Sequence, residues 1–158
     1  VHLESLSNAR LRLEQAEILC KVLSSGEGGE APRGTSPAVI AGDFNVAEEG
    51  PYADLEENAS FEALRETHGF TDACAHLGLT YDTRSDAGEA SADGGPGPGA
   101  RNAMVRRAYD QPSDWARYDR VWLRGGLKVA AGRLAGADAF REGLWISDHF
   151  GIEFELGH

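Results

Sequence analysis

The side chains best suited to chemistry follow a short apolar run that ends at a glycine. Residues 38–46 read Ala-Val-Ile-Ala-Gly-Asp-Phe-Asn-Val. Such a run is typical of a buried strand, and α/β proteins place their active sites where strands end. Asp43 and Asn45 stand two positions apart, so in extended backbone both side chains project to the same side. The alternative is an ordinary turn, because Asp and Asn also hydrogen-bond their own backbone.

Three further clusters place polar side chains beside expected strands. They are residues 2–5 (His-Leu-Glu-Ser), 117–120 (Arg-Tyr-Asp-Arg) and 147–149 (Ser-Asp-His). Strand ends meet at one edge of an α/β sheet, so we expect these side chains to lie near Asp43. Oxygen ligands beside a histidine suit a Mg²⁺ ion and a phosphate group. Each cluster taken singly is more often a turn, a cap or a surface loop, whereas their combination favours a shared site.

The elements that must position these clusters begin with a strand–helix–strand unit. Residues 1–4 are expected to end a strand, and apolar residues at helical spacing predict an amphipathic helix from about Leu6 to Leu23. Ser5 or Ser7 would cap that helix. Together with the strand at 38–46, this order predicts an α/β layered fold.

The rest of the chain predicts two short helices and two or three strands. The expected elements are a helix near Ser60–Thr67 with Ser60 as its cap, a second short helix opening at 70–74, strands at Tyr118–Leu123 and Phe150–Leu156, and a segment Leu127–Ala131. The last of these would pair with Tyr118–Leu123 as a hairpin across the turn at Gly125-Gly126. Glycine- and proline-rich composition predicts flexible insertions at about 25–37 and 85–100.

Length and charge restrict the function classes. A chain of 158 residues forms one domain with a real core. The net charge of −11 argues against a general nucleic-acid coat. Residues 101–133, however, carry 8 Lys and Arg against 3 Asp. A local basic zone of this kind suits a site that meets phosphate at one place, and a solvated arginine-rich loop is the alternative.

Cysteine usage and the apolar runs favour an intracellular protein. The two cysteines, Cys20 and Cys74, lack metal-binding spacing, and Cys20 falls on the apolar side of the first helix. No apolar run approaches the roughly 20 residues of a membrane helix, and the first residues do not form a signal peptide. Because the chain begins at Val1 without an initiator Met, we expect it to be a piece of a longer protein.

With these clusters in this order, the chain resembles the endonuclease/exonuclease/phosphatase superfamily. The segments that carry the resemblance are 42–45 (Gly-Asp-Phe-Asn), 117–120 and 147–149. Within the superfamily it is most similar to the tyrosyl-DNA phosphodiesterase 2 subfamily, on residues 2–5, Arg12, Gln15, 79–83 (Leu-Thr-Tyr-Asp-Thr) and 147–151. The resemblance implies an α/β fold in which residues 1–158 are the C-terminal half of a two-sheet, DNase I-like sandwich flanked by helices.

The resemblance also implies catalytic roles. Asp43 would position or deprotonate the attacking water, and Asn45 would bind the phosphate and support that geometry. His149 would hydrogen-bond a phosphoryl oxygen as the phosphorus becomes five-coordinate. Asp119 would orient the His149 imidazole and hold its charged form. Asp43 and Asp148 would belong to or border the metal shell.

The remaining implied roles concern the substrate. His2 and Ser5 would contact the scissile phosphate. Tyr81 stands where the subfamily has a tryptophan, and its ring would stack near the substrate. Arg117 and Arg120 would contact DNA.

The implied activity is hydrolysis of 5′-phosphotyrosyl protein–DNA adducts in nuclear DNA repair, by a Mg²⁺-dependent enzyme (Mn²⁺ being the other candidate ion) that is a monomer at full length. Its leaving group is a phenolate of pKa about 10, which needs little help from a general acid. The alternatives are another phosphoester within the superfamily, such as an abasic DNA backbone, an RNA tail or a lipid head group, and a non-catalytic remnant that serves as a binding module. The superfamily carries its principal glutamate ligand in its first half, which has no counterpart here. We therefore expect this chain alone to bind metal weakly and to be nearly inactive.

Overall fold

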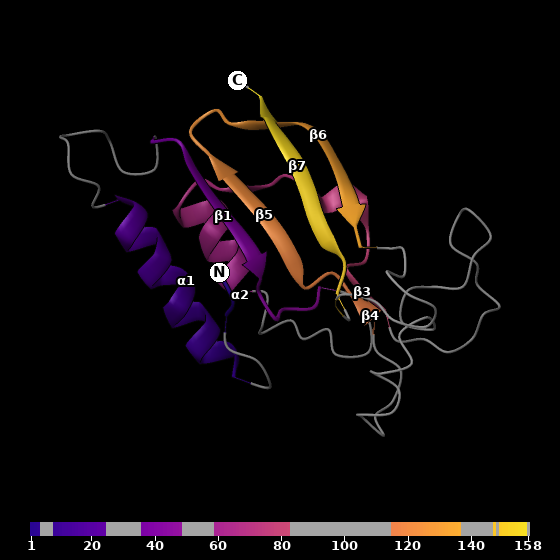
Figure 1. Ribbon diagram of the computed structural model, residues 1–158. Coiled ribbons are helices and arrows are strands. Elements are labelled where there is room, and N and C mark those ends of the chain that lie inside the picture. Colours follow the sequence, from indigo (N-terminus) through magenta and orange to yellow (C-terminus); the bar gives the residue numbers. More distant parts are fainter. Residues whose placement is uncertain are drawn as a thin grey trace.

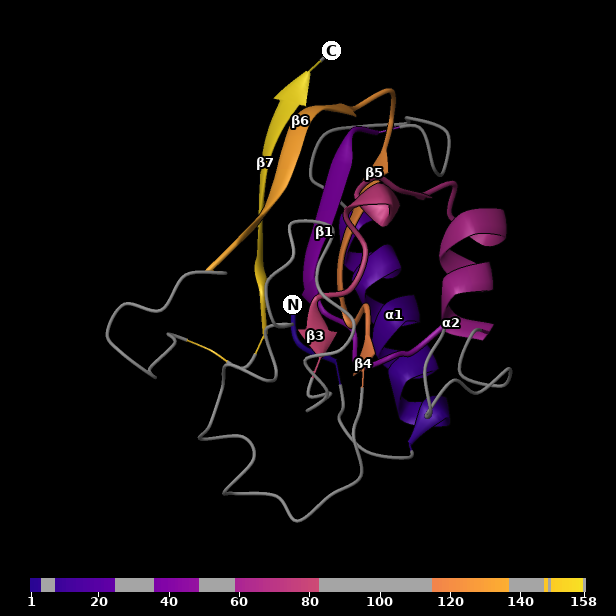
Figure 2. The same ribbon diagram turned by 90° about the vertical axis from the view of Figure 1, so that its right-hand side faces the viewer.

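The computed structural model describes residues 1–3, 8–24, 36–48, 59–82, 115–136, 147 and 149–157. The predicted insertion at 85–100, and the part of the other insertion at 25–35, lie outside the described residues. Two helices, a central sheet and a second sheet form three successive layers in the described part of the chain (Figures 1 and 2).

The elements follow one another in this order. They are α1 (Ala9–Ser24), β1 (Ala38–Asp43), α2 (Ala59–Glu62), the π-helical turn η1 (Ala63–Thr67), β2 (Thr71–Asp72), the 3-10 turn η2 (Ala75–Leu77), β3 (Tyr81–Asp82), β4 (Trp115–Ala116), β5 (Asp119–Arg124), β6 (Lys128–Ala135) and β7 (Gly151–Gly157). Within the described ranges, no helix has the length and apolar character that a bilayer span requires.

The central sheet has the strand order β1-β5-β2. Strand β1 runs antiparallel to β5, with register from Ala38 opposite Arg124 to Asp43 opposite Asp119. His2 bridges Asp43 in the parallel sense, so the chain enters beside β1, crosses through α1 and returns in β1. This confirms the expected strand–helix–strand order, with the first strand reduced to one bridge in the described residues.

Helix α1 packs through its apolar face against the central sheet. Ala16 and Cys20 are buried, and Leu19 and Leu23 pack beside them. The helix starts slightly later than predicted, because the Leu11 N–H donates to Asn8 Oδ1 at 3.4 Å, the contact of a capping residue. The two serines that were expected as caps lie outside the described residues.

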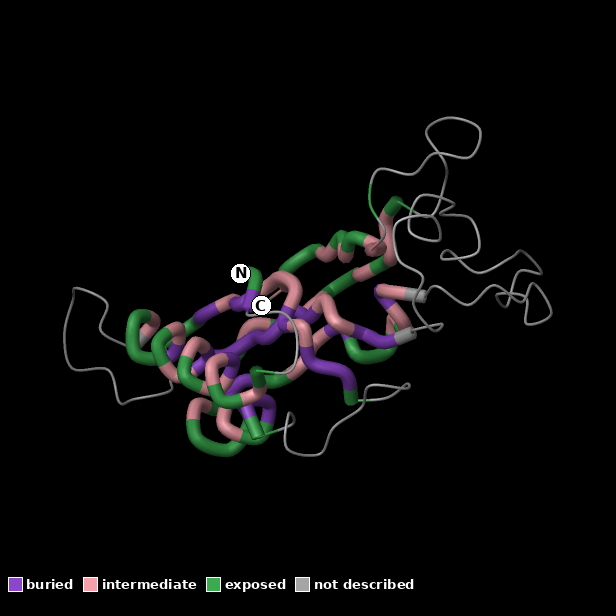
Figure 3. The backbone as a smooth tube through the Cα atoms, turned by 90° about the horizontal axis from the view of Figure 1, so that it is seen from below, coloured by how far each residue is buried: buried purple, intermediate pink, exposed green. Residues whose placement is uncertain are grey.

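The central sheet has an apolar cluster on each face, and Figure 3 shows the buried residues concentrated along the middle of the molecule. Toward the helices, Trp122 packs with the rings of Phe44 and Phe61 at centroid distances of 6.3 and 5.3 Å. Toward the second sheet, Val121 and Leu123 pack with the β6–β7 pair. Alternate residues of β5 therefore face different layers.

Two predictions about the middle of the chain differ from the structure. Residues Thr71–Asp72 form strand β2, which pairs antiparallel with β5, and the short helix that was expected to open at 70–74 begins only at Ala75, as the 3-10 turn η2. The Ala73 N–H also donates to Val121 O at 2.8 Å, so the sheet satisfies the backbone that a short helix would leave unpaired. Ser60 is buried inside α2, after its first residue, and is therefore not the cap of that helix.

The predicted hairpin is also wrong, although its turn is confirmed. Gly125 and Gly126 both have left-handed backbone, with φ of 74° and 83°. Beyond this turn β6 pairs with β7 in a separate two-stranded sheet and not with β5. The reason is packing, because Leu127 and Val129 cover the apolar cluster on the outer face of the central sheet.

Candidate active site

Two carboxylates meet at the end of the central sheet that carries the strand termini. Asp43 is the last residue of β1, Asp119 is the first of β5, and the two are register partners. Gly42 makes this edge accessible to the N-terminal segment. Its φ is +145°, and a Cβ at this position would collide with the Val1 carbonyl oxygen. Glycine is therefore needed where the two backbones approach.

Asn45 forms both the turn and the link to the N-terminal segment. Its N–H donates to Asp43 Oδ1 at 2.8 Å, and its side-chain Nδ2 donates to Leu3 O at 2.9 Å. The residue has left-handed backbone with φ of +51°, so the extended geometry that was expected to align it with Asp43 does not persist. The turn alternative is thus correct for the backbone, while both side chains still lie at the same edge.

His149 lies against Asp119. Its Nδ1 is 2.8 Å from Asp119 Oδ2, and the two side chains are 24% and 20% exposed. The His149 N–H donates to Ser147 Oγ at 3.1 Å, which fixes the backbone just before β7. Since a carboxylate only accepts, Nδ1 carries the proton in this contact, and in the neutral imidazole the lone pair is on Nε2.

Aromatic rings surround the histidine. The Tyr81 ring lies 4.9 Å from the His149 ring between centroids, and the Tyr118 ring lies 6.1 Å from it. Tyr81 and His149 also form an antiparallel bridge. Tyr81 thus lies beside His149, and its contact with the substrate stays a prediction. Tyr118 was not among the predicted site residues, although its position beside Asp119 in the sequence was a signal for it.

His2 completes the described part of the site. Its Nε2 is 3.6 Å from Asp43 Oδ2, and its side chain is 70% exposed. The predicted phosphate contact Ser5 and the predicted metal ligand Asp148 lie outside the described residues, as do residues 101–114 of the basic zone predicted at 101–133. The structure therefore brings together six of the predicted residues: His2, Asp43, Asn45, Tyr81, Asp119 and His149.

The surroundings of Asp43 raise the pKa of its carboxyl group above the usual 3.8. Burial is the main cause, and the charge of Asp119 acts in the same direction. The Asn45 N–H and the nearby His149 and His2 oppose the rise without cancelling it. A carboxylate with a raised pKa binds a proton more readily than an exposed one, which suits a group that takes a proton from water.

Arg117 and Arg120 belong to a buried ion-pair cluster, in contrast to the expected DNA contact. Arg120 is 1% exposed, and its Nη1 lies 2.6 Å from Glu48 Oε2 and 3.0 Å from Asp72 Oδ2. Arg117 Nη2 lies 2.7 Å from the same Asp72 oxygen. Because neighbouring residues of a strand point to opposite faces, Arg120 points toward the helices and lies 4.5 Å from the ring of Phe61. These contacts assign both arginines a structural role.

The described residues do not form a metal site by themselves. Among them, no group of three or more His, Cys, Asp or Glu side chains is arranged to hold a metal ion. Asp43 and Asn45 could supply two oxygen atoms, whereas Mg²⁺ is octahedral and takes one or two carboxylates together with waters or substrate oxygens. Residues outside the described part of the chain would have to supply the rest.

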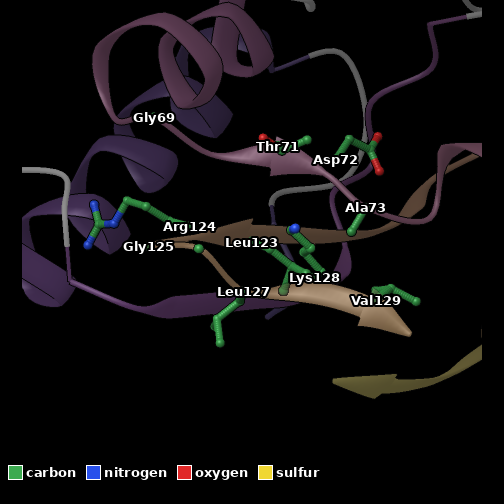
Figure 4. Close-up of a pocket in the computed structure, with 11 residues that line it drawn as sticks. Gly69, Thr71, Asp72, Ala73, Leu123, Arg124, Gly125, Leu127, Lys128 and Val129 are labelled. Atoms are coloured by element: carbon green, nitrogen blue, oxygen red, sulfur yellow. The ribbon is translucent and has the colours of Figure 1, made fainter. Parts of the chain in front are cut away.

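A surface pocket lies away from the candidate site. This pocket, of about 480 Å³, lies at the other end of β5 from Asp119, between β2 and the turn that leads into β6. Figure 4 shows Thr71 and Asp72 on one side of it and Leu123, Leu127 and Lys128 on the other. None of its lining residues belongs to the predicted site. The candidate site is thus defined by its hydrogen bonds and charges.

Comparison with known proteins shows the fold. No family model and no curated protein sequence matches this chain. Among solved structures, it is similar to TDP2 (tyrosyl-DNA phosphodiesterase 2) of D. rerio, determined with a single-strand DNA product, with 21% identity and a TM-score of 0.63 over 99% of this chain. The chain is also similar to a mannosyl-6-phosphatase from Bacteroides thetaiotaomicron, with 17% identity and a TM-score of 0.57 over 99% of this chain.

An endonuclease/exonuclease/phosphatase from Bacteroides vulgatus gives 17% identity and a TM-score of 0.56 over 99% of this chain. The chain spans about half the length of these structures, namely 54%, 49% and 47% in the order given. At this level of identity the likeness establishes architecture. The expected DNase I-like α/β fold, with antiparallel sheets in layers flanked by helices, is therefore confirmed.

Proposed function

We propose that this chain contributes the histidine–aspartate pair of a phosphoester hydrolase, and that the substrate is a phosphodiester of DNA. The observation that carries the proposal is the 2.8 Å contact of His149 Nδ1 with Asp119, next to the Asp43 carboxylate on the neighbouring strand. The architecture shared with a phosphatase and with endonuclease/exonuclease/phosphatase proteins supports it.

In this proposal His149 stabilises negative charge on the phosphoryl group. Asp119 holds Nδ1–H, so Nε2 is the ring atom that meets a phosphoryl oxygen and donates to it when the imidazole is protonated. The carboxylate behind the ring favours the protonated form. A donor that is already in place as charge develops on the phosphoryl oxygens lowers the barrier without reorganisation.

Asp43 takes the proton of the attacking water. Its pKa is raised by burial and by Asp119, and one of its oxygens is already held by the Asn45 N–H. The other oxygen lies 3.6 Å from Nε2 of the exposed His2 side chain. A proton released to this carboxylate therefore stays within the site.

Tyr81 and Tyr118 support an aromatic or nucleic-acid substrate. Their rings lie 5.7 Å apart and border the His149 ring, so a base or a phenol could stack on this cluster. A 5′-phosphotyrosyl DNA adduct combines both chemistries, and the similar TDP2 structure from D. rerio contains a single-strand DNA product. Repair of such adducts in the nucleus, with Mg²⁺ or Mn²⁺ held partly by residues outside the described ones, is the specific form of the proposal.

The second candidate is a phosphomonoesterase acting on a sugar phosphate. It rests on the likeness to the mannosyl-6-phosphatase, which covers as much of this chain as the likeness to TDP2. A His–Asp pair that stabilises phosphoryl charge serves either reaction.

A substrate panel tests the proposal. The longest product of the gene and the 158-residue chain are incubated with Mg²⁺ and a 5′-tyrosyl oligonucleotide, an abasic-site duplex, a phospholipid or mannose 6-phosphate. We expect the tyrosyl oligonucleotide to be cleaved fastest, with little activity in the 158-residue chain. His149→Ala should abolish cleavage, while His76→Ala, which changes an exposed histidine on η2, should not. Faster cleavage of mannose 6-phosphate would support the second candidate, and no cleavage of any substrate by the longest product would contradict both.

A further inference from the structure

Thr80 lies between the two segments that carry the histidine–aspartate pair. It is completely buried, directly before β3. Strand β3 pairs with β4 on one side, and Tyr81 bridges His149 on the other. Asp119 and His149 are 30 positions apart in sequence, so a segment that contacts both can set their relative position.

Three hydrogen bonds connect Thr80 to the segment that carries Asp119 and to the segment that carries His149. The Asp119 N–H donates to Thr80 Oγ1 at 3.0 Å. The Phe150 N–H donates to Thr80 O at 2.8 Å, and the Thr80 N–H donates to Ala116 O at 3.2 Å. The side chain thus holds the backbone of Asp119, while the carbonyl group holds the residue that follows His149.

The hydroxyl group has a function that an apolar side chain of the same shape cannot fulfil. The Asp119 N–H is at the start of β5, where its acceptor is a side-chain oxygen. A buried N–H that loses its acceptor forces the local backbone to move or to admit water. Movement of Asp119 would directly change its contact with His149 Nδ1.

We propose that Thr80 is a positioning residue for the His149–Asp119 pair, acting through its hydroxyl on Asp119 and through its carbonyl on the backbone beside His149. Its catalytic consequence rests on the function proposed above. Its structural consequence does not, because the hydrogen bond between the two side chains can be observed without substrate.

The test uses NMR on the 158-residue chain and three variants. Thr80→Val removes the acceptor and keeps the shape, Thr80→Ser keeps the acceptor, and Thr71→Val makes the same change at an exposed threonine on β2. The ¹⁵N shifts of the neutral His149 ring report its tautomer, since Asp119 holds the Nδ1–H form. Amide hydrogen exchange at Asp119 and Phe150 reports the two hydrogen bonds separately.

We expect Thr80→Val to speed exchange at Asp119 by about tenfold or more and to mix the two ring tautomers. Thr80→Ser and Thr71→Val should retain the wild-type tautomer. The proposal would be overturned if Thr80→Val folds and keeps both the wild-type exchange rate at Asp119 and the wild-type tautomer of His149. If Thr80→Val does not fold, hydrogen exchange in the wild-type protein still tests the proposal. An Asp119 amide that exchanges there as fast as an exposed amide would overturn the proposal.

A second measurement separates this proposal from the proposed function. In the product that cleaves substrate, Thr80→Val should lower kcat with little change in KM, and it should cause no further loss in an Asp119→Asn background. Equal losses in both backgrounds would assign Thr80 a general structural role and overturn the proposal. If no substrate is cleaved but the tautomer changes as expected, the proposed function fails and the positioning role stands.

Discussion

Asp43 and Asp119 face each other as register partners across the β1–β5 ladder, which places two carboxylates at the same edge of one sheet. Their environments differ. Asp119 lies against His149 Nδ1 at 2.8 Å, whereas Asp43 accepts a backbone N–H and has His2 at 3.6 Å. The first carboxylate is therefore suited to hold a protonated imidazole, and the second, with its raised pKa, to take a proton.

The raised pKa of Asp43 predicts a pH-dependent stability difference between wild type and Asp43→Asn. A carboxyl group whose pKa rises on folding contributes stability that is fully present below its unfolded value of 3.8 and is lost as pH rises through the folded pKa. The free energy of unfolding of wild type minus that of Asp43→Asn should therefore fall as pH increases above 3.8. Urea denaturation from pH 3 to pH 7 in the presence of EDTA measures this difference. A difference that rises with pH would contradict the direction of the shift.

The His149–Asp119 contact predicts that both side chains are required for turnover. His149→Ala should lower kcat by several orders of magnitude. Asp119→Asn should lower it by about 10²–10⁴, since an amide neither fixes the Nδ1–H tautomer nor stabilises the imidazolium. Steady-state kinetics on the longest product of the gene measures both, with circular dichroism as the check on folding. Activity of His149→Ala within tenfold of wild type would show that the role of the histidine is wrongly assigned.

The sequence was sufficient to predict which residues converge. Asp43, Asp119 and His149 each stand where an apolar run begins or ends, and such runs are local signals. The left-handed backbone of Asn45 was harder to predict from the sequence. A residue other than glycine adopts this conformation only where contacts hold it, here the hydrogen bond from its Nδ2 to Leu3 O.

The roles of Arg117 and Arg120 were interpreted wrongly, although the alternation of β5 carried a signal. Arg120 and Trp122 are two positions apart and point toward the helices, opposite to Asp119 and Val121. The pairing of β2 with β5 and of β6 with β7 had no such local signal. Each depends on partners far away in the sequence and on which apolar face the strand covers.

The small number of described oxygen ligands predicts that the 158-residue chain binds Mg²⁺ weakly. An ion at a concentration equal to its Kd stabilises the folded state by only about 0.4 kcal/mol. Calorimetric titration should show no saturation up to about 1 mM, and Asp43→Asn should give the same curve as wild type. Saturable binding with a Kd below about 0.1 mM that Asp43→Asn removes would show that this chain contains a complete site.

The ion pairs around Arg120 predict that this arginine stabilises the fold far more than Arg133 does. Arg120→Met should destabilise the fold by about 3–5 kcal/mol, because it leaves the buried Asp72 carboxylate and the partly exposed Glu48 carboxylate with fewer cationic partners. Arg133→Met should have little effect, since its pair with Glu153 is exposed, the two side chains being 73% and 61% accessible. Urea denaturation of both variants at neutral pH makes the comparison.

Lowering the pH should reduce the loss of unfolding free energy that Arg120→Met causes. Burial alone would raise the pKa of Glu48, but the hydrogen bonds and charges of Arg120 and Arg65 outweigh it and lower the pKa below 4.5. The stability that this ion pair contributes is thus present above pH 4.5 and is lost as pH falls through the folded pKa. Repeating the denaturation at decreasing pH should bring wild type and Arg120→Met closer together. A penalty that stays constant down to pH 3 would mean that Arg120 stabilises the fold through its packing on Phe61 and not through its charge.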